Sequence, residues 1–298
     1  MESFAIALLF HLETATARLD RERMTSQTLP VAPDLLPQVR ESCIEAGALA
    51  LELFRPGAKT AARTWSKSGG SPVTEADIAV DTFLRIRLSE LLPEAAWLSE
   101  ETVDDAQRLS RRLVWVVDPI DGTRAFMAGS PDWAVCVALL ADGVPVTGVV
   151  HAPACDATYT ARRHGGAHRN GQPIATTRLT ELGGARIAGP KPMLDALARI
   201  DTFEAAEKIP SLALRLTRIA DGTIDAGLVS PDARDWDLAA AHLVLDEAGG
   251  RLSDGIGNPV VYNREAPIHG MLVASGEGLA EPLLAAMQRL RETPPQGS

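Results

Sequence analysis

The sequence predicts a layered α/β fold, because segments of helical periodicity are interspersed with short apolar strands and hairpin signals. Residues 36–53 carry apolar side chains at helical spacing. Residues 135–140 and 144–150 are apolar runs joined through Asp142-Gly143, a dipeptide typical of two-residue hairpins. Hydrophobic residues make up 46% and charged residues 23% of the chain, a balance that favours a globular protein over long disorder.

Capping patterns predict where the helices begin and end. Asp34 is placed to cap the helix over residues 36–53. Thr74, with Asp77 three residues later, forms a capping-box pattern ahead of a second helix, with Asp in place of Glu. Further helices are expected over residues 212–220 and 237–248, the latter closed by Gly249-Gly250.

Short apolar runs predict the strands. Residues 95–98 and 115–117 are two such runs, and each ends just before a group of acidic residues. Another strand is expected over residues 224–229, and Asn170-Gly171 indicates a second hairpin. Periodicity alone does not fix the order in which these strands pair.

The length of 298 residues favours one large domain or two lobes that share a core. Residues 1–30 are expected to form a weakly ordered N-terminal extension, because they end in a polar stretch before the first periodic helix. The remainder, residues 31–298, is predicted to be a single domain with lobes of about 31–180 and 181–290. The last six residues are expected to be frayed.

Charge and cysteine content exclude several classes of function. With 29 basic and 39 acidic residues the net charge is −10, which disfavours binding of nucleic acid polymers. The apolar run from Phe4 to Phe10 is far shorter than the ~20 residues of a membrane span. Cys43, Cys136 and Cys155 show no CxxC spacing, so neither a zinc site nor a disulfide framework is indicated, and a cytoplasmic location is expected.

Asp118 and Asp121 follow the strand 115–117, and we expect them in a tight turn at its end. Two carboxylates this close repel each other unless a cation lies between them, and Mg²⁺ prefers oxygen ligands. The Ile120 carbonyl offers a further oxygen. Gly122-Thr123 opens a short helix whose N-terminus suits an anion, and the Thr123 hydroxyl can cap that helix or orient a water.

Three other acidic positions lie at the boundaries of predicted elements: Asp77, the Glu100-Glu101 pair, and Asp237. Each alone has an ordinary explanation. Asp77 and Asp237 suit helix caps, and Glu100-Glu101 suits a solvated strand end. Taken with Asp118 and Asp121, however, they favour a metal site that also holds phosphate.

The sequence of these segments resembles that of the inositol monophosphatase family, which includes the 3′(2′),5′-bisphosphate nucleotidases. The resemblance spans roughly residues 35–285 and implies a layered αβαβα sandwich. One departure is Ser99, where Gly commonly precedes the paired Glu, and we expect its side chain to be tolerated. The matching segments are SPVTEAD (71–77), SEET (99–102), WVVDPIDGT (115–123), WDLAA (236–240) and EAGG (247–250).

The resemblance implies catalysis with two or three Mg²⁺ ions and no phosphoenzyme. Glu100, Asp118 and the Ile120 carbonyl would hold the first ion. Asp118, Asp121 and Asp237 would hold the second, and Glu100 would contribute to a third, weaker one.

Catalytic and substrate-binding roles follow from the same resemblance. Asp77, Glu100 and Thr123 would be catalytic, with Asp77 and Thr123 orienting the water that attacks phosphorus. Gly122 and Thr123 would bind the phosphate. The residues expected to face the substrate are Glu100, Ile120, Asp121, Gly122, Thr123 and Asp237.

Two positions suggest the substrate. Inositol-selective members carry a Glu seven residues before the metal-binding Asp of the WD motif, and this chain has Ser230 there. Lys67 ahead of SPVTEAD is also more like the bacterial bisphosphate nucleotidases. Candidate contacts for a second phosphate are Arg124, Lys191 and Arg234.

The sequence thus favours a phosphomonoesterase that acts on 3′-phosphoadenosine 5′-phosphate or a similar small bisphosphate. Two alternatives stay open: an inositol-1-phosphatase or broad sugar phosphatase, and a non-catalytic protein that uses this fold to bind a partner. A homodimer also stays open.

Overall fold

The computed structural model describes residues 35–67 and 70–292. The extension predicted for residues 1–30, the cap assigned to Asp34 and the predicted C-terminal fraying lie outside the described residues. Helix α2 (Leu36–Leu53) spans the predicted residues, and its N-cap Leu35 makes no side-chain capping bond.

A seven-stranded sheet occupies the first half of the described chain. Only its edge pair β3–β4 is parallel, and the other neighbours are antiparallel. Asp142 and Gly143 have φ angles of 51° and 76°, as the predicted β5–β6 hairpin requires. In sheet order, which is also chain order, the strands are β3 (Ala96–Ser99), β4 (Leu113–Asp121), β5 (Ala134–Ala141), β6 (Val144–Ala152), β7 (Ala157–Arg162), β8 (Ala167–Arg169) and β9 (Gln172–Pro173).

A five-stranded sheet forms from the second half, and a separate two-stranded pair, β1 (Thr64–Ser66) and β2 (Pro72–Thr74), precedes α3. In the larger sheet β12 is parallel to β10 and antiparallel to β14. The order of the five is β11 (Glu204–Ala205), β10 (Arg186–Ala188), β12 (Ala226–Val229), β14 (Leu272–Gly276) and β13 (Gly250–Asp254).

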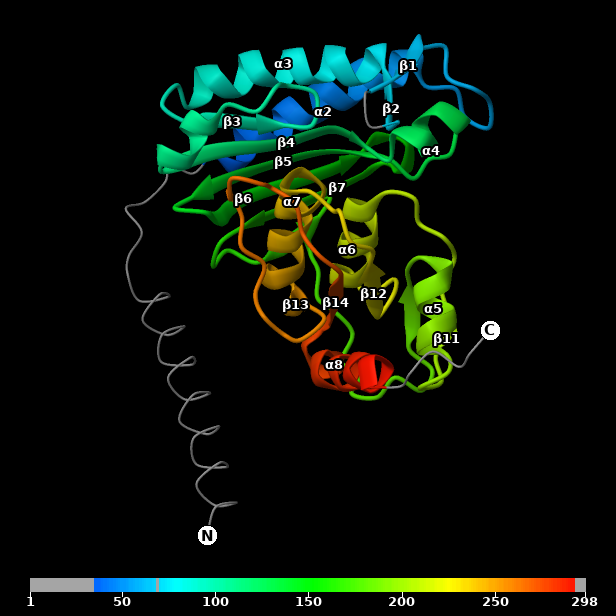
Figure 1. Ribbon diagram of the computed structural model, residues 1–298. Helices are drawn as coiled ribbons and strands as arrows, with labels where there is room; N and C mark the ends of the chain where they lie inside the picture. Colours follow the sequence, from blue (N-terminus) through cyan, green and yellow to red (C-terminus); the bar gives the residue numbers. More distant parts are fainter. Residues whose placement is uncertain (1–34, 68–69, 293–298) are drawn as a thin grey trace. The chain divides into compact units, whose positions relative to one another are not determined.

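The helices stack with the two sheets in five layers, which confirms the predicted αβαβα sandwich (Figure 1). Helices α2 and α3 cover one face of the seven-stranded sheet, α6 and α7 lie between the sheets, and α5 and α8 lie beyond the five-stranded sheet. The bounds of the remaining helices are α3 (Glu75–Leu91), α4 (Thr123–Ala128), α5 (Lys191–Leu197), α6 (Leu212–Ala220), α7 (Asp235–Glu247) and α8 (Glu277–Glu292), with 3₁₀ turns at Ala106–Ser110 and Pro153–Cys155.

The main core fills the space between the sheets and is built largely from Ala, Val and Leu, as the low aromatic content of 4% requires. A buried cation also joins distant segments. Arg108 is 1% exposed and donates to Asp104, Asn263 and the Arg264 carbonyl at 2.6–2.9 Å. These bonds attach the loop after β13 to the edge of the seven-stranded sheet.

Two predicted boundaries at the site were wrong. Strand β4 does not stop at Val117 but continues to Asp121, so Asp118 and Asp121 lie in the strand, with a register shift against β5 between them. Helix α7 begins at Asp235, which places Asp237 inside its first turn. Within the described residues, no helix has the length and apolar character needed to cross a membrane.

Candidate metal centre

Three carboxylates converge where β4 meets the first turn of α7. One oxygen from each of Asp118, Asp121 and Asp237 lies within 4.8 Å of the others. The register shift in β4 is what brings Asp118 and Asp121 to the same place, since an undistorted strand points residues three apart to opposite faces.

Burial raises the pKa of every carboxyl in this cluster, and mutual repulsion adds to it. The pKa of Asp121 rises to about 6 and that of Asp237 to about 8, while that of Asp118 is raised well above its usual range. Clustered carboxylates are costly to ionise unless a positive charge lies among them. A set of hard oxygen donors with this need fits a divalent cation such as Mg²⁺.

Asp121 has a second set of contacts at the N-terminus of α6. Its carboxylate accepts the Ser211 hydroxyl and the backbone N–H groups of Leu212 and Ala213, at 3.3 and 2.7 Å for the two N–H bonds. Ser211 was not among the predicted site residues, although a serine directly before a periodic helix is a signal of an N-cap. Helix α6 thus fixes one of the three clustered carboxylates.

Asp77 and Thr123 lie beside the cluster and touch each other. The predicted capping box is present: Thr74 N and Oγ1 donate to Asp77 Oδ2 at 2.8 and 2.6 Å. The Thr123 hydroxyl lies 3.3 Å from Asp77 Oδ1 and 3.1 Å from the Ile120 carbonyl oxygen. Burial raises the pKa of Asp77 to about 6.

Gly122 is the N-cap of α4, so Thr123 does not cap this helix. Gly122 has φ 92°, and a Cβ there would lie 2.9 Å from the Asp132 carbonyl oxygen. Only glycine fits this position without strain, because both the left-handed backbone and the close approach exclude a side chain. The turn that presents Ile120 and Thr123 therefore depends on Gly122.

Glu100 and Glu101 follow β3 and share one cation. Lys67 Nζ lies 2.9 Å from Glu100 Oε1 and 2.7 Å from Glu101 Oε1. Burial raises the pKa of Glu101 to about 7, although Lys67 opposes the shift. The charge of Glu100 contributes to the raised pKa of Asp118, so Glu100 lies close enough for the two charges to interact, although it is not one of the three clustered carboxylates.

The candidate contacts for a second phosphate differ in their surroundings. Lys191 is paired with Asp195 at 2.8 Å, and Arg124 is exposed. Arg234 is half-buried, its guanidinium lies 5.9 Å from the centre of the Trp236 ring, and its charge acts on Asp237. Of these three candidates, Arg234 is the one whose charge lowers the pKa of a clustered carboxyl, that of Asp237.

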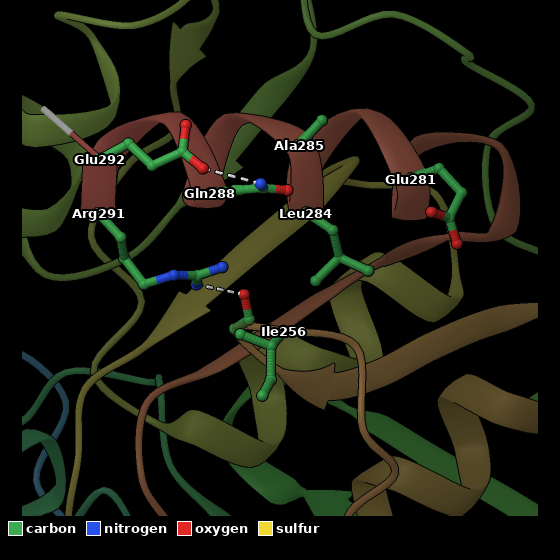
Figure 2. Close-up of a pocket in the computed structure, with 8 residues that line it drawn as sticks. Ile256, Glu281, Leu284, Ala285, Gln288, Arg291 and Glu292 are labelled. Carbon is green, nitrogen blue, oxygen red and sulfur yellow. Dashed lines mark hydrogen bonds between the residues drawn. The ribbon is translucent and has the colours of Figure 1, made fainter. Parts of the chain in front are cut away.

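A surface hollow lies elsewhere, between α8 and the turn after β13. Figure 2 shows Leu284 and Arg291 of α8 pointing toward Ile256 across it, with Arg291 Nη1 donating to the Gly255 carbonyl. The residues that line it include none of the predicted site residues. The hollow and the carboxylate cluster are separate features.

Comparison with known proteins assigns the chain to a class of phosphoric monoester hydrolases that use divalent metals, typically Mg²⁺. The sequence profile described as "Inositol monophosphatase family" matches residues 34–292. The chain belongs to this family, whose members act on small phosphorylated substrates.

The individual similarities agree with that family. A 3′(2′),5′-bisphosphate nucleotidase of Aggregatibacter actinomycetemcomitans is 31% identical, with 78% of this chain and 90% of the relative covered. An inositol-1-monophosphatase of Mesorhizobium japonicum is 32% identical, with 75% and 85% covered. The solved structure of a Thermotoga maritima IMPase superposes with a TM-score of 0.76 at 23% identity, covers 87% of this chain and 98% of that one, and supports the fold alone.

Proposed function

We propose that the protein is a Mg²⁺-dependent phosphomonoesterase that hydrolyses 3′-phosphoadenosine 5′-phosphate or a similar small bisphosphate. The observation that carries the metal-dependent chemistry is the convergence of Asp118, Asp121 and Asp237 within 4.8 Å. The similarity to a bisphosphate nucleotidase over 90% of that relative supports the substrate class.

In this proposal Glu100, Asp118 and the Ile120 carbonyl hold one Mg²⁺, and Asp118, Asp121 and Asp237 hold another. Glu100 contributes to a third, weaker ion. Bound Mg²⁺ supplies charge neutralisation at the phosphoryl oxygens and makes a water more acidic. The buried carboxylates supply the negative charge that attracts the ions, and their attachment to β4, α6 and α7 keeps them in place.

Asp77 and Thr123 orient the attacking water. Asp77 Oδ2 is occupied by Thr74, so Oδ1 is the oxygen that faces Thr123 and the water. Burial raises the pKa of Asp77 only to about 6, so its carboxylate is ionised at neutral pH and can accept a hydrogen bond from the water. Gly122 and Thr123 bind the phosphate at the start of α4.

Two residues support a bisphosphate over an inositol phosphate. Ser230 is exposed just past the end of β12, where inositol-selective relatives place a Glu, so no carboxylate there repels a second phosphate. Arg234, stacked near Trp236, supplies a positive charge beside Asp237. Both features favour an anionic group next to the scissile phosphate.

A phosphate-release assay tests the proposal. The substrates are 3′-phosphoadenosine 5′-phosphate, inositol 1-phosphate and fructose 1,6-bisphosphate, each with Mg²⁺ and with excess EDTA. An Asp118→Asn preparation purified in parallel controls for contaminating phosphatases. We expect the highest kcat/KM for the bisphosphate nucleotide and no activity with EDTA.

Other results separate the alternatives. A preference for inositol 1-phosphate would make the substrate assignment wrong and leave the metal-dependent chemistry intact. Equal activity on all three substrates would indicate a broad sugar phosphatase. No release from any of them would support the non-catalytic alternative.

A further inference from the structure

We propose that Asp81 is a positioning residue, which acts from α3 on the turn Ser99–Thr102 and thereby fixes Glu100 relative to Asp77. This inference rests on the proposed function, in which Glu100 is a metal ligand. Asp81 lies outside the predicted site, and nothing in its own sequence position indicated a role there.

The geometry consists of hydrogen bonds from both ends of one turn. The Ser99 hydroxyl donates to Asp81 Oδ1, and Thr102 Oγ1 donates to Oδ2 at 2.8 Å. The Ser99 oxygen also accepts the Glu101 backbone N–H at 3.3 Å. Each oxygen of one carboxylate therefore holds one flank of the Glu100-Glu101 pair.

The Asp81 carboxylate is buried and depends on its hydrogen bonds. Asp81 is only 7% exposed, and both hydrogen bonds come from neutral hydroxyls rather than from a cation. Burial of a charged group is unfavourable unless its partners compensate it. An apolar side chain at position 81 would fill the same space without burying a charge, but it would not hydrogen-bond Ser99 and Thr102 to α3.

Helix α3 connects this turn with the proposed water-orienting carboxylate. Asp77 and Asp81 are four residues apart, so their side chains lie on the same face of the helix, one turn from each other. Asp77 is fixed by the capping box, and Asp81 then sets how far the Glu100 turn lies from it. Ser99, the departure from the family's common glycine, takes part in this contact.

Titration calorimetry with Mg²⁺ alone, combined with kcat, KM and the melting temperature of the full chain, tests the proposal. The variants are Asp81→Asn, Ser99→Ala and Thr102→Val. The controls on α3 are Thr82→Val, which removes an exposed hydroxyl bonded to the Ile78 carbonyl, and Glu90→Gln, which removes an exposed carboxylate.

We expect Asp81→Asn to weaken Mg²⁺ binding about tenfold, the lower end of the loss seen when partners of metal ligands are removed. kcat should fall with it and KM should change less than kcat, because the proposed phosphate contacts at Gly122 and Thr123 are not touched by the substitution. Ser99→Ala and Thr102→Val should show smaller losses. Adding Thr102→Val to Asp81→Asn should cost little more, whereas adding Ser99→Ala also removes the bond from the Glu101 N–H. The two control variants should bind Mg²⁺ as the wild type does.

Wild-type Mg²⁺ affinity and kcat in folded Asp81→Asn would overturn the inference, as would a lowered melting temperature without a change in Mg²⁺ affinity. If Asp81→Asn does not fold, Ser99→Ala and Thr102→Val decide the matter in the same way. If the wild type itself binds no Mg²⁺, the proposed function fails instead, so the two failures are distinguishable.

Discussion

Asp118 is the carboxylate shared by both ions in the proposed centre, and its substitution is the sharpest test at the scale of a single residue. It is 1% exposed, and its pKa is raised by burial and by Glu100, Asp121 and Asp237. Asp118→Asn keeps the shape and removes the charge. We expect turnover to fall on the order of 10³-fold or more in a steady-state assay, because several kcal/mol of transition-state stabilisation are lost.

The control for this prediction is stability. Without metal, Asp118→Asn should unfold at a temperature equal to or above that of the wild type, since it removes one buried charge from a repelling group. Near-normal turnover would contradict the proposal that Asp118 is a ligand of both ions. A strongly lowered melting temperature would mean that the loss of activity reflects unfolding and not the loss of a metal ligand.

Ser230 carries the substrate assignment, and Ser230→Glu tests it. A carboxylate there would accept ring hydroxyls of inositol and repel a second phosphate, a contact worth ~1.5–3 kcal/mol. We expect the ratio of kcat/KM for the bisphosphate nucleotide to that for inositol 1-phosphate to fall roughly ten- to a hundredfold. Ser230→Gln is the matched neutral control, and an equal effect from Gln would show that charge is not responsible.

The individual residues also show which parts of the site local sequence patterns can predict. Asp118, Asp121 and Asp237 were picked out because they lie next to apolar runs and within recognisable motifs. Ser211, which donates a hydrogen bond to Asp121, was not picked out, and it lies 90 residues along the chain. Lys67 was noted only for its position ahead of SPVTEAD, and its pairing with Glu100, 33 residues away, was not predicted. Such contacts depend on the three-dimensional arrangement of the helices, which periodicity does not encode.

At the scale of elements, α2 offers a test in which two effects oppose each other. Alanine is favoured over glycine inside a helix by about 1 kcal/mol. A Cβ at Gly47, however, would lie 2.6 Å from His151 Cδ2 and 3.2 Å from Pro153 Cγ. We expect the overpacking to dominate and Gly47→Ala to lower the free energy of unfolding by ~1–3 kcal/mol in urea titration.

The second half of this test substitutes His151, the residue that a Cβ at Gly47 would contact most closely. His151→Ala removes the ring that clashes, so Gly47→Ala introduced into His151→Ala should cost less than it does in the wild type. A non-additive double-mutant cycle is the expected sign of direct contact. If Gly47→Ala stabilises the protein, the helix propensity has prevailed and α2 can move away from β6.

Elements set by local signals were predicted well, and those set by pairing were not. Helices α2 and α6 have the predicted bounds, and both predicted hairpins are present, because periodicity and turn residues act within a few positions. Strands β10, β13 and β14 were not predicted. They are short, and each pairs with a strand that lies beyond a long connection, so no hairpin signal identifies them.

At the scale of the whole molecule, the carboxylate cluster links stability to pH and to Mg²⁺. A carboxyl whose pKa is higher in the folded than in the unfolded state binds more protons when folded, so metal-free stability falls as the pH rises between the two values. Burial raises the pKa of Glu101 to about 7 and that of Asp237 to about 8, against usual values of 4.5 and 3.8.

The pKa shift of His151 changes stability with pH in the opposite direction, so the pH range of the measurement is chosen above its titration. Burial lowers its pKa to about 4 from 6.5, so its contribution rises with pH up to about 6.5 and is constant above that. Between about pH 6.5 and pH 8 the contribution of His151 is constant, while the raised pKa values of Glu101 and Asp237 still lower stability as the pH rises. We therefore expect the melting temperature of the EDTA-treated protein to fall across this interval.

Mg²⁺ should reverse the trend, because it binds the ionised form. The added stability is RT ln(1 + [Mg²⁺]/Kd), about 2.7 kcal/mol at a hundredfold excess over Kd. Since protons compete for the same oxygens, the Mg²⁺-induced rise in melting temperature should be larger at the alkaline end of the interval. Differential scanning fluorimetry with NaCl at matched ionic strength measures it, and Asp118→Asn should reduce both the pH slope and the Mg²⁺ shift. A Mg²⁺ shift that is independent of pH, or equally large in Asp118→Asn, would place the ion away from this cluster.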